Sequence, residues 1–312
     1  MASTVTSNYA GEVLDFVKMK LTTENELFQK GLVNLIPKIM GDVHVPKWTA
    51  TEMIGARANT PSASIGDNTW TETTISVGEF MLYHRFLPRN FESVWRKYQP
   101  TGQLVFRELP PAAQKIFFDL IMKTAQATIE RVLLTGNTGG GSAPDNIIDG
   151  LETQLTADGS VNAVGTPLTL SAGNIEGEFD RCFTATPSVV RRHPDFKWLI
   201  NYNTQDLYQQ AIKDQTYKGN DFTSAGPMTH RGKPVVAVNG LSDNTIIGGV
   251  FSPNIDSNLH VAMDWNQESL RLGESVLHVD RLQNDSIEYF VRGDFKMGIG
   301  YSFPEEITYY DG

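Results

Sequence analysis

Residues 108–151 read ELPPAAQKIFFDLIMKTAQATIERVLLTGNTGGGSAPDNIIDGL, and this stretch decides the fold. Its first part, Glu108–Leu134, carries apolar residues at helical spacing, and the prolines at its start are tolerated in a first helical turn. A helix of this length spans roughly 35–40 Å, which exceeds a typical globular helix. We therefore expect an extended layer of chain along it, as in a flat, shell-like subunit.

The spacing also predicts which face of this helix packs. That face comprises Ala113, Ile116, Phe117, Leu120, Ile121, Thr124, Ala127 and Thr128. Gly136 is expected to end the helix as a glycine C-cap, followed by the glycine-rich turn 136–141 and then Asp149-Gly150-Leu151. A phosphate-binding loop is disfavoured here, because no Gly-Lys-Ser/Thr is present and the loop follows a helix instead of preceding one.

Upstream, residues 1–10 are small and polar, and two short amphipathic stretches follow them. The second carries Leu27, Leu32, Leu35 and Ile36 and is expected to be a helix, with Thr23 as N-cap and Pro37 as its end. Two short helices without a core of their own predict an arm that packs on something else.

Residues 43–90 favour strands, at 44–48 and 69–77, because threonine, valine and tryptophan suit half-buried sheet positions. Between them, residues 56–68 are mostly small and polar and bury little. This pattern predicts a long two-stranded hairpin with a polar tip. Since an isolated ribbon is marginally stable, we expect it to rest on a neighbouring subunit.

Downstream, residues 172–255 predict a compact α/β unit. Its expected elements are a helix near Ile175–Val190, a strand at 197–201, a helix capped by Asn203 or Thr204, a polar loop at 214–228, and strands at 232–238 and 245–250. From Ile287 to Tyr301 apolar residues alternate with polar ones, which predicts a strand with one buried face.

Composition excludes several classes of protein and of site. The net charge of −10 argues against a dedicated nucleic-acid grip, and the single cysteine, Cys182, excludes an internal disulfide. No apolar run approaches the roughly 18 residues of a membrane span. The six histidines lack metal-ligand spacing, and Gly-x-Ser-x-Gly is absent. We assign no catalytic, cofactor-binding or metal-ligating residue, and we expect no enzyme.

The order of these parts resembles the major capsid protein of tailed bacteriophages, which has the Hong Kong 97-type fold. The resemblance covers nearly the whole chain, and its specificity lies in the order of loose motifs. They are the glycine turn leading to Gly150-Leu151, the strand Trp198–Asn201, the helix Thr204–Lys213 and the Gly-x-Pro-Val-Val of Gly232–Val236.

This resemblance implies an α+β fold with named parts. They are an N-terminal arm (1–42), an extended loop or E-loop (43–90) with its tip at Arg57–Asn68, a peripheral domain with a long spine helix (91–150), an axial α/β domain (151–255) and C-terminal strands of the peripheral domain (256–312). Asp214–Met228 would then surround a fivefold or sixfold axis, and Leu270–Asp285 would approach threefold or twofold contacts.

The resemblance further implies a virion capsid subunit that assembles in the cytoplasm of a bacterial host. Pentamers and hexamers would form an icosahedral head enclosing double-stranded DNA without sequence-specific binding. A separate scaffolding protein, a portal and minor capsid proteins are the implied partners, with no membrane and no cofactor. Two alternatives stay open: an encapsulin-type shell of a cellular nanocompartment, and a soluble α/β hydrolase or binding protein.

Overall fold

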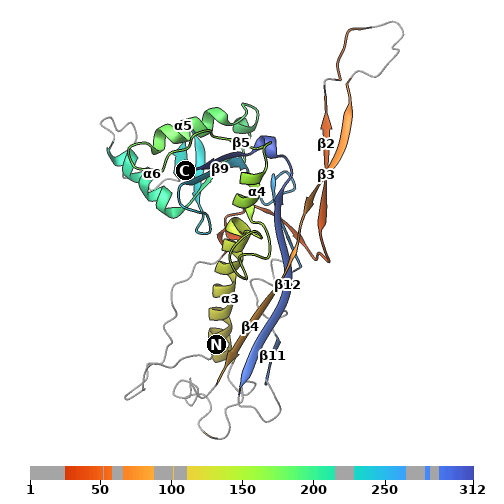
Figure 1. Ribbon diagram of the computed structural model, residues 1–312, viewed down its shortest axis with the longest axis vertical. Helices are drawn as coiled ribbons and strands as arrows, with labels where there is room; N and C mark the ends of the chain where they lie inside the picture. The colour runs from red at the N-terminus through yellow and green to blue at the C-terminus, as the bar shows by residue number, and fades with distance from the viewer. Residues whose placement is uncertain are drawn as a thin grey trace.

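The computed structural model describes residues 25–51, 53–57, 66–87, 101, 111–214, 228–264, 278–281 and 288–312, and for 111–120 and 278–281 it gives the backbone course. Helices and strands are mixed (Figure 1). An α/β unit lies beside a long sheet, one long helix runs along that sheet, and a two-stranded hairpin projects beyond both. In the described residues, no helix has the length and apolar character needed to cross a bilayer.

The predicted long helix is confirmed as α3, Pro111–Thr135. Its packed face differs from the prediction: Ile129, Val132 and Leu133 are buried, whereas Thr124 is exposed and Ile121 is only half-buried. The predicted members at 113–120 lie outside the described side chains. Threonine and alanine present little apolar area, so the elements that cover the helix decide its buried stripe, which lies on a different face from the one that the spacing predicts.

The glycine step after α3 is a close crossing of two backbones. Gly136 ends the helix, but it is not in the left-handed region that the predicted C-cap would use. The Gly150 N–H donates to the Gly136 carbonyl at 2.8 Å. A Cβ on Gly150 would lie 2.5 Å from the Gly136 nitrogen and 2.7 Å from the Leu134 carbonyl carbon. Glycine is therefore required at this position for space.

Asp149 closes the glycine-rich turn, because its Oδ1 accepts from both the N–H and the hydroxyl of Thr138 at 2.8 Å. Helix α4, Leu151–Ala157, begins directly after Gly150. The turn therefore returns the chain onto the end of α3, where Leu151 enters the core.

The long sheet is built around β12, Tyr289–Tyr301, which pairs antiparallel with β4 (Gly78–Phe86), β10 (Leu259–Met263) and β11 (His278–Arg281). The alternation predicted from Ile287 to Tyr301 is confirmed from Tyr289 to Met297, whereas Met297–Tyr301 is buried throughout, so both faces are covered in the last part of the strand. The predicted hairpin range 43–90 includes β4, which belongs to this sheet instead.

The N-terminal prediction needs a correction. Helix α1 spans only Glu26–Gln29 and is capped by Asn25, while Asn34–Pro37 forms β1, parallel to β10. The expected helix through Ile36 is therefore wrong, because its partner strand lies more than 220 residues away and no local pattern announces it. Leu27 and Leu32 are fully buried, so this part of the predicted arm packs in the chain's own core.

The α/β unit has a six-stranded sheet in the order β5-β13-β9-β6-β8-β7. The strands are β5 (Asn162–Ala163), β13 (Thr308–Asp311), β9 (Thr245–Val250), β6 (Phe196–Ile200), β8 (Lys233–Ala237) and β7 (Thr229–His230). The predicted strands at 197–201, 232–238 and 245–250 are confirmed as β6, β8 and β9. The C-terminal β13 adds to this sheet, which local pattern did not show.

Two helices pack with this sheet, and both differ from prediction at one end. Helix α5 spans Ile175–Ala185 and stops before Pro187, followed by the 3₁₀ turn Val190–Arg192, so the expected continuous helix to Val190 is wrong. Helix α6 spans Tyr202–Asp214. Its cap is Asn201, whose Oδ1 accepts from the Asn203 N–H at 2.9 Å, and not Asn203 or Thr204.

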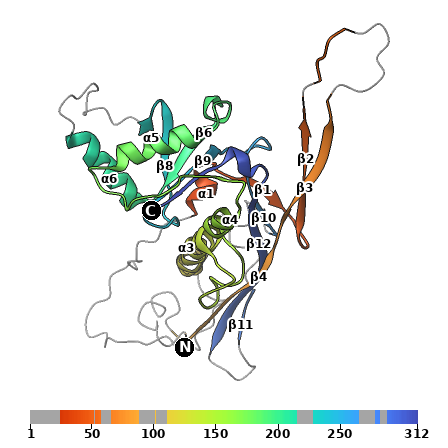
Figure 2. The same cartoon turned by 45° about the horizontal axis from the view of Figure 1, so that its top comes forward.

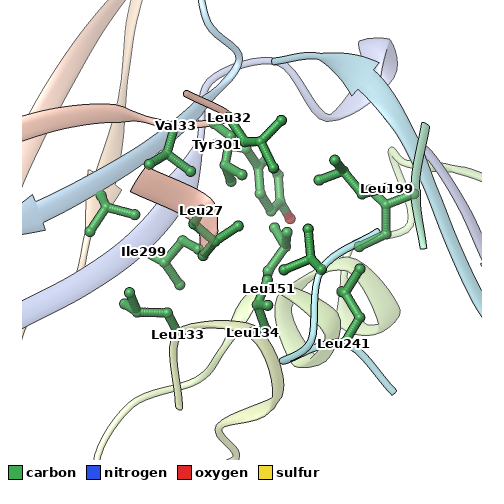
Figure 3. Packing of buried hydrophobic residues seen from close by; sticks show 14 of the residues in the cluster. Leu27, Leu32, Val33, Leu133, Leu134, Leu151, Leu199, Leu241, Ile299 and Tyr301 are labelled. Carbon is green, nitrogen blue, oxygen red and sulfur yellow. The ribbon is translucent and has the colours of Figure 1, made fainter. Parts of the chain in front are cut away.

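One hydrophobic cluster joins these parts. Leu27 and Leu32 from the N-terminal segment, Leu133 and Leu134 from α3, Leu151 from α4, and Leu199 and Leu241 from the α/β unit point toward one another (Figure 3). The same cluster reaches β12 through Ile299 and Tyr301. The α/β unit and the long sheet therefore share a continuous core around the end of α3.

Candidate assembly surfaces

The hairpin consists of β2 (Val43–Ala50) and β3 (Asn68–Ile75), paired antiparallel in a sheet of their own. Its base is attached to the body: Ile75 is buried against Ile39 and Ala262, and the Thr73 hydroxyl donates to the Ser302 carbonyl at 3.4 Å. Beyond this base the two strands extend away from the rest of the chain (Figures 1 and 2). The predicted strands are confirmed, and the described contacts of the hairpin with its own chain reach from the base to Lys47, whose Nζ lies 5.7 Å from the centre of the Phe303 ring.

Trp48 and Trp70 face each other across the hairpin. Their rings stack with centroids 5.4 Å apart and an angle of 3° between planes. They remain 57% and 70% exposed, which is high for such large apolar rings. Side chains alternate between the two faces along a strand. The tryptophan pair therefore lies on one face of the hairpin, and Val45 and Thr73 lie on the other face, which is turned toward the body.

From the sequence, these tryptophans were predicted only as strand residues, and the stacking of their two rings was not predicted. It depends on the register, in which Trp48 lies directly opposite Trp70. Further exposed apolar side chains follow β2 in the chain, with Met53 50% exposed and Ile54 91% exposed. Exposed apolar side chains concentrated on a projecting element are typical of an interaction surface.

A groove of about 700 Å³ lies between α3 and the inner face of the long sheet. Its lining is mostly apolar, with Ile121 and Ile129 from α3, Phe80 and Leu82 from β4, and Phe295 from β12. It is a second apolar surface, on a different part of the molecule from the hairpin.

Two kinds of reactive group can be checked in the described residues: metal-binding clusters and the cysteine thiol. They contain no group of three or more His, Cys, Asp or Glu side chains that could hold a metal ion. Cys182 is buried, and this burial raises the pKa of its thiol to about 12, so the thiolate nucleophile is not available.

His230 belongs to a chain of polar groups that resembles a catalytic relay. Its Nδ1 lies 3.0 Å from the Tyr208 hydroxyl, and its Nε2 lies 3.1 Å from Asp180 Oδ1. The Phe179 ring packs 5.1 Å from the imidazole, and burial raises the pKa of Tyr208 to about 12. This arrangement satisfies a buried histidine at the edge of the α/β sheet.

Several predicted contact regions lie outside the described residues. They include most of the hairpin tip at 57–68, the predicted axial loop at 214–228 except for its ends, and most of the turn at 270–285. Their predicted roles stay predictions.

Comparison with solved structures shows which known structures share the fold of this chain. It matches the capsid of an empty GTA particle with a TM-score of 0.60 at 14% identity, covering 96% of this chain and 94% of the other. It matches Gordonia phage Cozz with a TM-score of 0.60 at 12% identity, covering 97% and 90%. The Cyanophage A-1(L) capsid gives 0.55 at 13% identity, covering 96% of both chains.

No family model and no curated protein sequence matches this chain. The structural likeness extends over nearly the whole chain, so it shows that the chain has the fold of phage capsid subunits, the Hong Kong 97-type fold that the sequence predicted.

Proposed function

We propose that this chain is the major capsid protein of a tailed phage, which self-assembles as pentamers and hexamers into an icosahedral head around double-stranded DNA. The observation that carries the proposal is the hairpin, which projects from the body with its stacked Trp48–Trp70 pair exposed. The shared fold with phage capsids supports it. A second copy of the chain is the partner that would cover this surface.

The proposed parts follow the predicted boundaries with two refinements. The N-terminal arm is placed at 1–42, the E-loop at 43–90, the peripheral domain at 91–150 and 256–312, and the axial domain at 151–255. Within them, β4 belongs to the long sheet and β13 to the sheet of the α/β unit. The projecting part of the E-loop is therefore the ribbon of β2 and β3.

Such a subunit assembles through head-to-tail contacts, in which a projection of one copy lies on a different surface of the next. Contacts of this type close into rings when the rotation is right, which gives pentamers and hexamers. Each tryptophan can bury about 150–250 Å². Because every copy in a shell makes several contacts at once, interfaces that are modest individually yield a stable shell.

The remaining partners follow from the same proposal. A chain with net charge −10 can enclose DNA without gripping it. A separate scaffolding protein, a portal and minor capsid proteins would complete a head assembled in a bacterial cytoplasm. Particles filled with DNA support this role, whereas small DNA-free cages that co-purify with an enzyme indicate the encapsulin alternative.

The test is a paired substitution on the outward face of the hairpin. Trp48→Ser with Trp70→Ser should leave the body folded, with an unchanged urea unfolding midpoint, because both rings lie largely exposed on the projecting hairpin, and should abolish or strongly weaken assembly. The control, Trp48→Phe with Trp70→Phe, keeps an aromatic pair and should assemble. Size-exclusion chromatography and negative-stain microscopy read the outcome. Wild-type assembly by the serine variant would contradict the role given to the hairpin.

A further inference from the structure

The polar contacts where the α/β unit meets α3 include a buried carboxylate. Glu130 on α3 is 1% exposed. Its Oε2 accepts from the Glu26 N–H at 2.8 Å, and its Oε1 accepts from the Gly240 N–H at 3.3 Å. One side chain therefore bonds the first turn of α1 and the loop between β8 and β9.

The groups around Glu130 leave it without an ion pair of its own among the described residues. Lys30 Nζ donates to Glu26 Oε2 at 2.8 Å, to the Tyr202 hydroxyl at 2.9 Å and to the Ala237 carbonyl at 2.6 Å. Tyr202 in turn donates to Glu26 Oε1 at 2.9 Å. The cation of this cluster is therefore bound to Glu26.

The loop that Glu130 holds is pressed against the helices. A Cβ on Gly240 would lie 2.8 Å from Leu134 Cδ1 and 3.0 Å from Glu130 Cγ. Two residues later, the Ser242 N–H and hydroxyl donate to Glu152 on α4 at 2.7 and 2.6 Å. Residues 239–242 are thus bracketed by two buried carboxylates, one from each helix.

In this buried position, the charged form of Glu130 is less favourable in free energy than the protonated form. Burial raises its pKa to about 7, and the neighbouring Glu26 carboxylate acts in the same direction. The two backbone N–H donors and Lys30 oppose that rise. Tyr202 is the titratable group facing the cluster from α6, and residues 239–242 contribute none. The proton on Glu130 is therefore held near neutral pH, as long as the junction stays closed.

We propose that Glu130 is a proton-controlled latch between α3, α1 and the 239–242 loop. With its proton, the neutral side chain sits in the closed junction without a charge to solvate. Without it, a buried carboxylate is left with two N–H donors and, among the described residues, no ion pair of its own, and opening the junction returns that charge to water. Proton loss therefore favours separation of the α/β unit and the N-terminal segment from α3.

The expected size of the effect follows from linkage. The opened junction exposes a glutamate with an ordinary pKa of 4.5, whereas the closed one has a pKa of about 7. Between these values, each pH unit increases the opening equilibrium by up to about tenfold. From pH 5 to pH 8 the ratio of open to closed junctions should rise by up to roughly 10²-fold. A purely structural carboxylate that never reprotonates would give no such slope.

Hydrogen exchange on the full-length protein tests the latch. After correction for intrinsic exchange rates, opening measured at the Glu26 and Gly240 amides should increase steeply from pH 5 to pH 8 in the wild type. Glu130→Gln keeps the shape and an acceptor oxygen but cannot titrate, so its opening at the Glu26 amide should be independent of pH. Burial also raises the pKa of Glu152, which holds the same loop through Ser242. Glu152→Gln removes this second titration and is the matched control, in which opening at the Glu26 amide should keep its slope.

Two outcomes would overturn the proposal. One is a wild-type profile that is flat between pH 5 and pH 8, which needs no variant to read. The other is an equally steep profile in Glu130→Gln. Both readings are independent of whether the chain forms shells, so failure of the latch is distinguishable from failure of the capsid assignment.

Discussion

Gly150→Ala tests the backbone crossing that positions α3 against the α/β unit. The added methyl would lie 2.5 Å from the Gly136 nitrogen, 2.7 Å from the Leu134 carbonyl carbon and 2.8 Å from the Leu134 oxygen. All three are backbone atoms, which cannot rotate away as a side chain would. Overpacking of this kind costs typically 1–3 kcal/mol and sometimes more, so we expect a loss of about 3 kcal/mol in the free energy of unfolding.

Urea unfolding followed by circular dichroism measures this loss, with wild type and variants in the same assembly state. At a slope of about 3 kcal/mol per molar urea, the midpoint should fall by about 1 M. Gly140→Ala is the matched control in the same turn, because a Cβ there meets nothing within 4 Å. It should leave the midpoint nearly unchanged. Equal midpoints for Gly150→Ala and Gly140→Ala would refute the crossing.

Three further predictions concern buried side chains. Leu133→Ala removes a fully buried leucine and should cost about 2–5 kcal/mol, measured by the same unfolding assay. Burial lowers the pKa of His230 below its ordinary 6.5, so the folded state binds fewer protons there. The free energy of unfolding is therefore highest above pH 6.5 and falls as the pH drops below that value. His230→Gln should flatten this decline in acid. An unchanged dependence of the free energy of unfolding on pH would contradict the burial of a neutral His230. Cys182 should react with a thiol reagent only on unfolding, and rapid labelling of the native protein would show that the thiol is accessible.

The long helix, the long strand and the hairpin could be predicted from sequence, because the pattern that specifies each of them lies within a single segment. The extent of α3 follows from helical spacing over 25 residues, and the buried face of β12 follows from its alternation. The hairpin strands follow from their composition and from the polar stretch between them. In each case local chemistry and tertiary structure agree.

The errors lie where a distant partner decides. Leu35 and Ile36 suit a helix face as well as a strand, and only pairing with β10 selects the strand. Likewise, Thr308–Asp311 joins β9 and β5 of the α/β unit, although the chain before it belongs to the long sheet. Spacing within a segment cannot report such contacts.

The candidate surfaces were predictable as regions but not as residues. Composition indicated a projecting hairpin, yet the Trp48–Trp70 stack required the strand register. Glu130 gave no signal, since a glutamate on a long helix is ordinarily solvated. Its role depends on α1 and the 239–242 loop meeting at the same point.

Electron microscopy of the purified full-length protein is the most direct measurement of the central claim, that copies of this chain complete one another's exposed surfaces. We predict closed shells built from rings of five and six subunits. A field of dispersed single molecules at high protein concentration would contradict that claim.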